Sequence, residues 1–273
     1  MTVTARSEAN RKLVLDFCSL AFLEGRHREA AERFLGERYI QHNPFVADGV
    51  EGFVQFFESW EANTRPDFRH RILRVIADED YVAVHATIHE GNGHAGSVLC
   101  DIFRIEDDRI VEHWDAFKPL SDPATIPHGN GETETIATDA VSDRESNRRT
   151  VVLFYDKAFV QKRYIEAADE FFGERYIQHN SFVADGIEAY KRHFGESALH
   201  RRSSYSQIPV RFIVDDDHAA VQVHLRKDLN DPAERGFVIV DIFRFDRGKI
   251  VEHWDVAMPV PDPDTVPHSN GVL

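Results

Sequence analysis

Two short motifs, which between them contain two aspartates and one histidine, each occur twice in the chain. They read Asp-Ile-Phe-Arg and Ile-Val-Glu-His-Trp-Asp. Carboxylate and imidazole groups together can take a proton from a carbon next to a carbonyl and donate one to the developing enolate oxygen. In an apolar pocket, burial would raise the pKa of such a carboxylate, and a neighbouring imidazolium would lower it again. The expected acid–base groups are Asp101, His113 and Asp115, with Asp241, His253 and Asp255 as their counterparts.

A third recurring motif adds another histidine to each group. Gly-Glu-Arg-Tyr-Ile-Gln-His-Asn occupies residues 36–43 and returns unchanged as residues 173–180, which places His42 and His179 at equivalent positions. We predict that Asp115 acts as the general base, that His42 or His113 donates the proton, and that Asp101 orients a histidine ring. The alternative is structural, because side chains in such turns often satisfy local backbone groups and a duplication copies structural residues as faithfully as functional ones.

Other roles for the same groups stay open. Asp101 and Asp115 could pair with His113 or Arg104 only to hold a hairpin together, since an unpaired buried carboxylate is costly. Imidazole and carboxylate ligands also suit Zn or Fe. No His-Glu-x-x-His spacing or equivalent local metal motif is present. We therefore predict no metal and no cofactor.

The repeated motifs define an internal duplication. The offset between copies is 137 at Gly36 and 140 at Asp101 and Ile110, and the closing segments 127–131 and 267–271 also match. A period this long allows each copy to close its own core, unlike a solenoid repeat. The predicted organisation is a first domain at residues 1–135, a linker at 136–145 and a second domain at 146–273, because the stretch 132–143 between the copies is rich in Thr, Glu, Asp and Ala.

Each copy shows a helical pattern first and a strand pattern afterwards. Apolar residues recur at three- and four-residue spacing in the expected helices, whereas the later segments are rich in β-branched and aromatic residues. Helices followed by an antiparallel sheet indicate an α+β layout. In the first copy the expected helices are 13–21, 27–35 and 50–60, the loop is 39–48, and the strands are 68–75, 81–89, 97–105 and 109–117.

The last hairpin of the second copy predicts which residues share a face. A three-residue loop with Gly248 in the left-handed bulge position would pair Phe245 with Lys249 and place Asp241 opposite His253, with Asp255 on the same face. Trp114 and Trp254 would then point to the opposite face and pack at a domain or subunit contact. Glu112 and Glu252 would share that outer face, either solvated or paired with Arg104 and Arg244.

The order of helices, the Tyr-Ile-Gln-His-Asn-Pro loop and the two terminal strand motifs resemble the SnoaL-like branch of the nuclear transport factor 2 superfamily. The resemblance covers nearly all of both copies. It implies two tandem cone-shaped α+β barrels, each with N-terminal helices packed on a curved antiparallel sheet around a deep, mostly apolar pocket. The residues expected to bind the substrate are Tyr39, His85, Phe103, Tyr176, His224 and Phe243.

Members of this superfamily include polyketide cyclases, ketosteroid isomerase and limonene epoxide hydrolase, so the fold alone does not give the function. Similarity to the epoxide hydrolase places His42 and His179 at its water-orienting Asn, and Asp115 and Asp255 at its acid–base Asp. The hydrolase also uses an Arg and an Asp two residues apart on the middle strand. Those positions hold other residues here, His85 and Thr87 or Gln222 and His224, which argues against epoxide opening.

Composition excludes several classes of partner. The formal net charge is −15 and no Lys/Arg run is present, which disfavours nucleic acid and anionic membranes. The two cysteines, Cys18 and Cys100, suggest no disulfide framework, and no apolar run is long enough for a membrane span or a signal core. We expect a soluble, cytoplasmic protein whose copies pack as an internal pseudo-dimer, with assembly into homo-oligomers left open.

The predicted function is cofactor-independent acid–base catalysis on a small hydrophobic carbonyl compound, of the cyclase, aldol-type lyase or isomerase type. Three alternatives remain at this point. One is a hydrolase that activates water for attack on an epoxide, the second is a non-catalytic protein that binds a small ligand, and the third is a metal-dependent enzyme that uses the same His and Asp residues.

Overall fold

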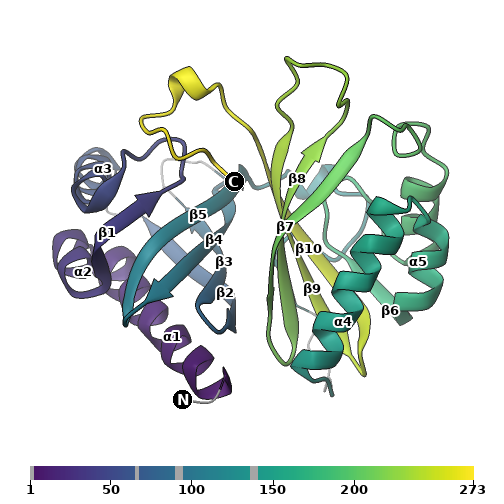
Figure 1. Cartoon of the computed structure of the whole chain (residues 1–273), viewed down its shortest axis with the longest axis horizontal. Coiled ribbons are helices and arrows are strands. Elements are labelled where there is room, and N and C mark those ends of the chain that lie inside the picture. Colours follow the sequence, from purple (N-terminus) through teal and green to yellow (C-terminus); the bar gives the residue numbers. More distant parts are fainter. Residues whose placement is uncertain (1–2, 65–67, 90–94, 136–140) are drawn as a thin grey trace. The chain divides into compact units, whose positions relative to one another are not determined.

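A computed structural model describes the chain except for residues 1–2, 65–67, 90–94 and 136–140. It divides into two compact units (Figure 1). Unit 1 consists of Met1–Pro119 and Pro261–Leu273, and unit 2 of Leu120–Val260. The sequence repeats and the compact units therefore differ at the tails: the closing segment of each copy belongs to the unit that the other copy builds. Half of the predicted linker, residues 136–140, lies outside the described residues.

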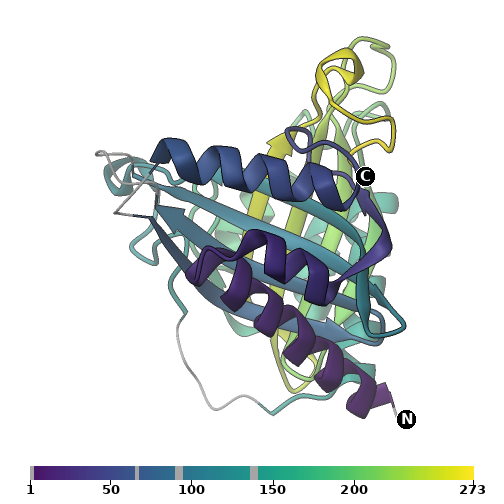
Figure 2. The same cartoon turned by 90° about the vertical axis from the view of Figure 1, so that its left-hand side faces the viewer.

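Unit 1 begins with three helical segments, which cover one face of its sheet (Figure 2). Helix α1 (Val3–Cys18) continues into a π-helical turn, η1 (Ser19–Leu23), and is followed by α2 (His27–Phe34) and α3 (Gly49–Thr64). The spacing of apolar residues explains this placement, because the side chains of the buried stripe point to one side of the helix. Val14, Phe17, Cys18 and Ala21 in α1 and η1 are at most 1% exposed.

The sheet of unit 1 has five strands in the order β1-β5-β4-β3-β2. The four predicted strands are present, and an unpredicted edge strand joins them in parallel to the last one, so the sheet is mixed rather than wholly antiparallel. The strand bounds are β1 (Leu35–Gln41), β2 (Arg69–Asp78), β3 (Tyr81–His89), β4 (Ser97–Glu106) and β5 (Arg109–Pro119).

Strand β1 lies where the sequence predicts the end of a helix and the start of a loop. Its register against β5 shifts between Leu35 and Ile40, and its central residues are exposed. This irregularity hides the alternation of apolar and polar residues by which a half-buried strand is normally recognised. As a strand, β1 sends Gln41 and its neighbour His42 to opposite faces of the sheet.

The β4–β5 hairpin closes differently from the prediction. Its loop contains two residues, Asp107 and Asp108, both with positive φ (49° and 59°), and Arg247 and Gly248 form the same loop in unit 2. Two positive φ values in succession are typical of a type I′ turn. A two-residue loop alone would shift the expected pairing by one residue and would turn His113 and Asp115 to the face opposite Asp101.

A bulge in β5 returns His113 and Asp115 to the same face of the sheet as Asp101. Between Ile110 and Glu112 the register against β4 shifts, because Val111 is an extra residue in β5. Asp101 therefore lies directly opposite Asp115, and in unit 2 Asp241 lies opposite Asp255. The predicted pairing of Asp241 with His253 was wrong, since His253 pairs with Phe243. The predicted face was right nevertheless. The observed partner of Asp241 lies two residues beyond the expected one, and side chains two residues apart in a strand lie on the same face.

Unit 2 repeats this topology with the strand order β6-β10-β9-β8-β7. Its third helix is shorter and ends in a second π-helical turn. Among the described residues, every helix of the chain is too short or too polar to form a membrane span. The elements are α4 (Arg144–Tyr155), η3 (Asp156–Val160), α5 (Tyr164–Phe171), β6 (Phe172–Gln178), α6 (Ile187–Tyr190), η4 (Lys191–Gly195), β7 (Ser206–Val214), β8 (His218–Arg226), β9 (Phe237–Asp246) and β10 (Lys249–Pro259), while short 3₁₀ turns, η2 (Pro123–Thr125) and η5 (Pro263–Thr265), begin the two tails.

Aromatic side chains fill the space between helices and sheet in each unit. In unit 1, Phe17 is 1% exposed and its ring centroid lies 5.6 Å from that of Phe53 and 5.8 Å from that of Phe103. Phe154 takes the same place in unit 2, 5.7 Å from Phe243. Buried aromatic groups of this size dominate core energetics, so they fix the helices over the face that carries the aspartates.

Candidate functional site

A cavity of about 240 Å³ lies in unit 1 where the helices meet the sheet. Ligand pockets commonly measure about 300–1,000 Å³, so this cavity suits a small molecule. Its wall is mostly aromatic and carries a few polar groups. The polar lining residues are Tyr39, Gln41, Asn43, His70, Ser97, Asp101, His113 and Asp115, and the aromatic ones are Phe17, Phe22, Phe45, Phe53, Phe56, Phe57, Phe68, Phe103 and Phe117.

Gln41, at the end of β1, fixes the state of the histidine. Its Oε1 accepts hydrogen bonds from the backbone N–H groups of His42 (2.9 Å) and Asn43 (2.8 Å), and it lies 2.8 Å from Nδ1 of His113. An amide oxygen can only accept, so Nδ1 of His113 carries a hydrogen. The second ring nitrogen of His113 is then the only one left to exchange a proton.

That second nitrogen is held by Asp101. Nε2 of His113 lies 2.9 Å from Oδ1 of Asp101, and both residues are less than 9% exposed. Burial alone would lower the pKa of His113, but the hydrogen bond to Asp101 and the charges of Asp101 and Asp115 raise it above its ordinary value. The hydrogen bond to Asp101 and the two neighbouring carboxylates thus favour the charged form of the His113 imidazole.

Asp115 is the carboxylate that remains available. Its Oδ2 accepts a hydrogen bond from Nδ2 of Asn43 (2.6 Å), whereas its Oδ1 is buried without a hydrogen-bond partner among the described residues. Burial raises its pKa to about 6, helped by the charge of Asp101 and opposed by that of His113 and the hydrogen bond from Asn43. At neutral pH, Asp115 is thus ionised and more basic than an ordinary aspartate, which suits a general base.

Tyr39 supplies a hydrogen-bond donor to the same cavity. Its hydroxyl oxygen accepts a hydrogen bond from Nε2 of Gln41 (3.2 Å), which leaves its own O–H to donate to a bound molecule. Burial and the charges of Asp101 and Asp115 raise the pKa of Tyr39 far above its ordinary value. The phenol therefore stays protonated under all working conditions.

His42 does not reach the cavity. It lies on the other face of the sheet, stacked on Trp114 with ring centroids 4.7 Å apart. Its Nε2 lies 3.0 Å from Oε1 of Glu112, whose other oxygen accepts a hydrogen bond from Nε of Arg104 (2.7 Å). The predicted proton-donor role of His42 therefore has no geometric support, and the reason is the alternation of β1, which turns Gln41 and Asn43 inward and His42 outward.

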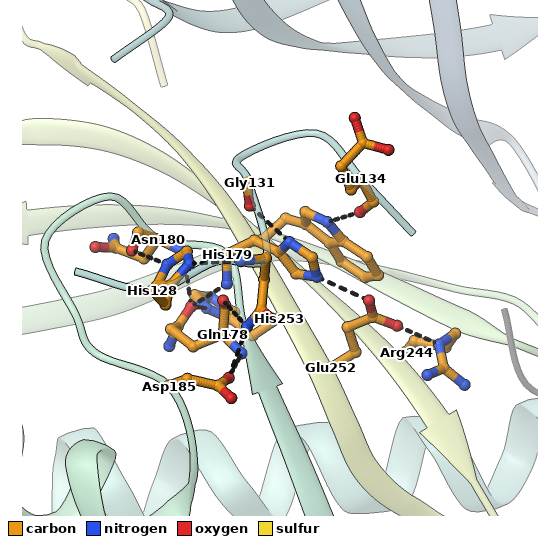
Figure 3. A network of polar contacts seen from close by, with 12 residues as sticks. His128, Gly131, Glu134, Gln178, His179, Asn180, Asp185, Arg244, Glu252 and His253 are labelled. Atoms are coloured by element: carbon orange, nitrogen blue, oxygen red, sulfur yellow. Dashed lines mark hydrogen bonds and ion pairs between the residues drawn. The ribbon is translucent and has the colours of Figure 1, made fainter. Parts of the chain in front are cut away.

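His179 is placed in the same way in unit 2. It stacks on Trp254 at 4.8 Å, and its Nε2 lies 2.8 Å from Oε1 of Glu252. Glu252 is 0% exposed and pairs with Arg244 at 2.6 Å, which agrees with the predicted pairing and not with a solvated side chain (Figure 3). Trp114 and Trp254 lie on the face opposite His113 and His253, as predicted.

The exchanged tails hold the loops that carry these residues. In unit 1, Nε2 of His268 lies 3.0 Å from the carbonyl oxygen of Asn43, and Nδ2 of Asn270 donates to the carbonyl oxygen of Gln41 (3.0 Å) and to Oδ1 of Asp48 (2.7 Å). Asp48 in turn accepts from the N–H of Gln41 (2.9 Å). The tail thus positions both side chains that hold His113 and Asp115.

The first copy's tail makes equivalent contacts in unit 2 (Figure 3). His128 lies 2.9 Å from the carbonyl oxygen of Asn180, and the carbonyl oxygen of Gly131 lies 2.8 Å from Nδ1 of His179. The indole N–H of Trp254 donates to the carbonyl oxygen of Glu134 (2.8 Å). Each Pro-His-x-Asn-Gly tail therefore recognises a Gln-His-Asn motif.

Two further predicted binding residues lie away from the cavity. His85 is paired in register with Cys100 and His224 with Val238, which puts both on the sheet face opposite to Asp101 and Asp241. Nδ1 of His85 lies 2.8 Å from the guanidinium of Arg74, and Nε2 of His224 lies 2.9 Å from a backbone carbonyl oxygen. The prediction grouped these positions by strand but had no register to assign their face.

The other predicted binding residues are near the acid–base groups. Tyr39 and Phe103 line the cavity, and the Phe103 ring stacks on His113 with centroids 5.0 Å apart. In unit 2, Phe243 lies 4.9 Å from His253. Tyr176 accepts a hydrogen bond from Gln178 (2.9 Å), as Tyr39 does from Gln41.

Sequence reasoning missed four polar residues that complete the two networks. They are Gln41 and Asn43 in unit 1 and Gln178 and Asn180 in unit 2. The signal was present, since they belong to the unchanged Gln-His-Asn repeat. If β1 and β6 had been predicted as strands, their alternation would have placed the histidine on one face and its two neighbours on the face of the aspartates.

The network of unit 2 differs from that of unit 1 at one oxygen. Gln178 lies 2.8 Å from Nδ1 of His253, whose Nε2 lies 3.0 Å from Oδ1 of Asp241. However, the hydroxyl of Tyr155 donates to Oδ2 of Asp241. The equivalent residue of unit 1 is Cys18, whose side chain is too short to reach Asp101 as Tyr155 reaches Asp241.

A metal ion is one ligand that this donor set could hold. Asp101, His113 and Asp115 each place a ligand atom within 4.8 Å of the others. Both nitrogens of His113 are already hydrogen-bonded, and Nδ1 is held as a donor by Gln41. Coordination through Nε2 would require the ring to lose its proton and its bond to Asp101. The arrangement as it stands fits proton transfer better than metal binding.

Comparison with known proteins places these residues in a family. The family model described as the SnoaL-like domain matches residues 14–113 and again 151–253. A comparison with curated proteins gives no match. The two matched stretches end at equivalent histidines, His113 and His253.

Solved structures resemble single copies of the repeat. TsrD from Streptomyces laurentii is 24% identical, with 40% of this chain and 88% of that chain covered and a TM-score of 0.35. An LEH-like epoxide hydrolase from M. tuberculosis is 19% identical, with coverage of 41% and 84% and a TM-score of 0.35. Bal32a, from a soil-derived mobile gene cassette, is 19% identical, with coverage of 41% and 91% and a TM-score of 0.35.

Proposed function

Because the chain belongs to the SnoaL-like domain family, with one such domain in each copy, we propose that unit 1 is an acid–base enzyme for a small hydrophobic carbonyl compound. One observation carries the proposal. Oδ1 of Asp115 is buried and has no hydrogen-bond partner among the described residues, and Asp115 is one of the residues that line the aromatic cavity. An unpaired buried carboxylate oxygen is costly, so a catalytic use accounts for its presence better than a packing role does.

The proposed step is the removal of a proton from the carbon next to the carbonyl. Oδ1 of Asp115 takes the proton and becomes a carboxylic acid, while the electron pair of the C–H bond moves into the carbonyl to form an enolate. The phenol of Tyr39 donates a hydrogen bond to the enolate oxygen, and the His113 imidazolium stabilises its negative charge. In a β,γ-unsaturated ketone the enolate is a dienolate, and return of the proton from Asp115 to its γ-carbon completes an isomerisation. If the enolate carbon attacks a second carbonyl instead, Asp115 returns the proton to the alkoxide that forms, which completes a ring closure or aldol addition.

Charge and size restrict the substrate. Asp101, Asp115 and the imidazolium of His113 together carry one net negative charge beside the cavity, which disfavours anionic ligands. The aromatic wall and the volume of about 240 Å³ suit a neutral compound of one or two rings. We therefore expect a neutral cyclic or aryl ketone rather than a carboxylate or a phosphate ester.

The test is hydrogen exchange at carbon. 2-Tetralone, a small two-ring ketone, would be incubated with the protein in D₂O, and deuterium incorporation next to the carbonyl followed by NMR. We expect exchange faster than in buffer with the wild-type protein and with Asp255→Asn, and loss of the acceleration in Asp115→Asn. Saturable binding of 2-tetralone without any acceleration would overturn the proposal in favour of a ligand-binding protein.

A water-activating hydrolase is the second candidate, and Asn43 favours it. The amide of Asn43 holds Oδ2 of Asp115, and Oδ1 has no hydrogen-bond partner among the described residues, so Oδ1 would be the oxygen that takes a proton from the attacking water. His42, the residue predicted for this task, lies on the opposite face. Incubation with styrene oxide in H₂¹⁸O would detect this activity as labelled diol, which the carbonyl proposal does not predict.

A further inference from the structure

The two units differ where the ligand would bind. Cys18 of unit 1 corresponds to Tyr155 of unit 2, at the repeat offset of 137, and Ser97 corresponds to Phe237, at the offset of 140. Ser97 lines the cavity, and Cys18 is fully buried beside Phe17, which also lines it. Both changes replace a small side chain of unit 1 by an aromatic ring in unit 2.

Tyr155 reaches the acid–base network of its unit. It is 1% exposed, and its hydroxyl donates to Oδ2 of Asp241, while His253 holds Oδ1 of the same carboxylate at 3.0 Å. Asp101, the equivalent residue in unit 1, lines the cavity. The phenol of Tyr155 therefore occupies space next to the carboxylate that faces the ligand cavity in unit 1.

Neighbouring rings fix Tyr155 in this position. Its ring centroid lies 5.1 Å from Phe159, 5.7 Å from Phe212 and 6.2 Å from Phe243. Phe212 is itself larger than its counterpart, Val75. Rotation of Tyr155 away from Asp241 would break its hydrogen bond and disturb this packing, so the phenol acts as a permanent part of the core.

The surroundings of the second aspartate, Asp255 in unit 2 and Asp115 in unit 1, also differ. Asp255 is half-buried, whereas Asp115 is 7% exposed. Phe117, which lines the cavity of unit 1, is replaced by Ala257. Unit 2 therefore places a phenol next to Asp241 and lacks the ring that lines the cavity with Asp115 in unit 1.

From these differences we propose that the chain binds one hydrophobic ligand, in unit 1, and that Tyr155 and Phe237 close the equivalent space of unit 2. Unit 2 then keeps its hydrogen-bond network as a structural copy. The second sequence copy still contributes to the unit 1 site. Its closing segment bonds to the carbonyl oxygens of Asn43 and Gln41 through His268 and Asn270. The class of ligand rests on the proposed function, whereas the assignment to one unit does not.

Reciprocal exchange of the differing residues tests the proposal. Binding of 2-tetralone would be measured by isothermal titration calorimetry for the wild type, Cys18→Tyr, Ser97→Phe and the matched unit 2 variant Tyr155→Cys. We expect one site per wild-type chain, at least about tenfold weaker binding in Cys18→Tyr and Ser97→Phe because a ring fills the cavity, and an unchanged unit 1 site in Tyr155→Cys. Circular dichroism checks folding, and Ser97→Phe carries the test if Cys18→Tyr does not fold.

Several outcomes would overturn the proposal. These are two equal sites in the wild type, undiminished binding in a folded Ser97→Phe or Cys18→Tyr variant, or no saturable binding by the wild type. Failure of the proposed function gives a different pattern, in which one ligand binds in unit 1 and no hydrogen exchange is catalysed. Catalysed exchange that depends on Asp255 and not on Asp115 would retain the chemistry and reject the assignment to unit 1.

Discussion

Replacement of Asp115 by Asn should stabilise unit 1 while it removes the base. The pKa of Asp115 is raised from an ordinary value of 3.8 to about 6, chiefly by burial. The folded state thus binds this proton more tightly than the unfolded chain does, so ionisation of Asp115 costs folding free energy as the pH rises. A pKa difference of about 2 corresponds to about 3 kcal/mol at about pH 8, where the cost is complete, and to only about 1 kcal/mol at about pH 4.5.

An amide does not ionise, and its oxygen can still accept the hydrogen bond from Asn43. Denaturant titration followed by circular dichroism should therefore show that Asp115→Asn gains more stability at about pH 8 than at about pH 4.5, by roughly 2 kcal/mol. Asp255→Asn is the matched substitution at the equivalent position of unit 2 and controls for the replacement of a carboxylate by an amide on the same strand position. A stability change for Asp115→Asn that does not vary with pH would refute the raised basicity on which the mechanism depends.

Three further substitutions test the supporting groups. Gln41→Leu leaves the Nδ1–H of His113 and the backbone N–H of Asn43 without their acceptor, whereas the N–H of His42 keeps the carbonyl oxygen of His113. We expect a loss of about 2–4 kcal/mol in denaturant titration; an unchanged midpoint would contradict the network. Tyr39→Phe removes the donor to the enolate oxygen, so kcat for deuterium exchange should fall by about 100-fold with little change in KM; a change in KM alone would assign Tyr39 to binding. Asn270→Ala should slow exchange in unit 1, whereas Asn130→Ala, its counterpart on the other tail, should leave the rate unchanged although both lose stability; equal rates in both variants would show that the tail does not position the site.

Much of the fold followed from local patterns. Helical spacing of apolar residues and alternation in the later strands gave the order of elements, and the repeated Asp and His motifs gave the side chains that meet on one face of each sheet. These patterns suffice where one face of an element is buried and the other is not, because burial then fixes the spacing. Asp101, His113 and Asp115 fall in this category.

The errors arose where long-range pairing decides the geometry. Strand β1 is irregular, and only its pairing with the parallel strand β5 defines it as a strand. Because this pairing is not visible in the sequence, His42 was predicted as a site residue in place of Gln41 and Asn43. The bulge at Val111 depends on the β4–β5 turn, so the exact partner of each aspartate could not be read from the turn sequence alone. The exchange of tails has no local signal, since residues 267–271 are separated from Gln41 by more than two hundred positions.

The difference between the units has a similar origin. Cys18 and Tyr155 both fit the buried stripe of a first helix, and an apolar pattern does not distinguish a residue that leaves space from one that fills it. The consequence of having Tyr155 in place of a cysteine is seen only in the structure, where its hydroxyl contacts Asp241. A duplication therefore predicts two related cores and leaves the number of functional sites to tertiary structure.

The most direct test of the central claim is the pH dependence of deuterium exchange into 2-tetralone, measured for the wild type, Asp115→Asn and Asp255→Asn. If Asp115 is the base, the catalysed rate should rise with pH around an apparent pKa near the value of about 6 for this carboxyl, and the acceleration should be absent at every pH in Asp115→Asn. Asp255→Asn should reproduce the wild-type profile. A wild-type rate and profile retained in Asp115→Asn would contradict the assignment of Asp115 as the catalytic base.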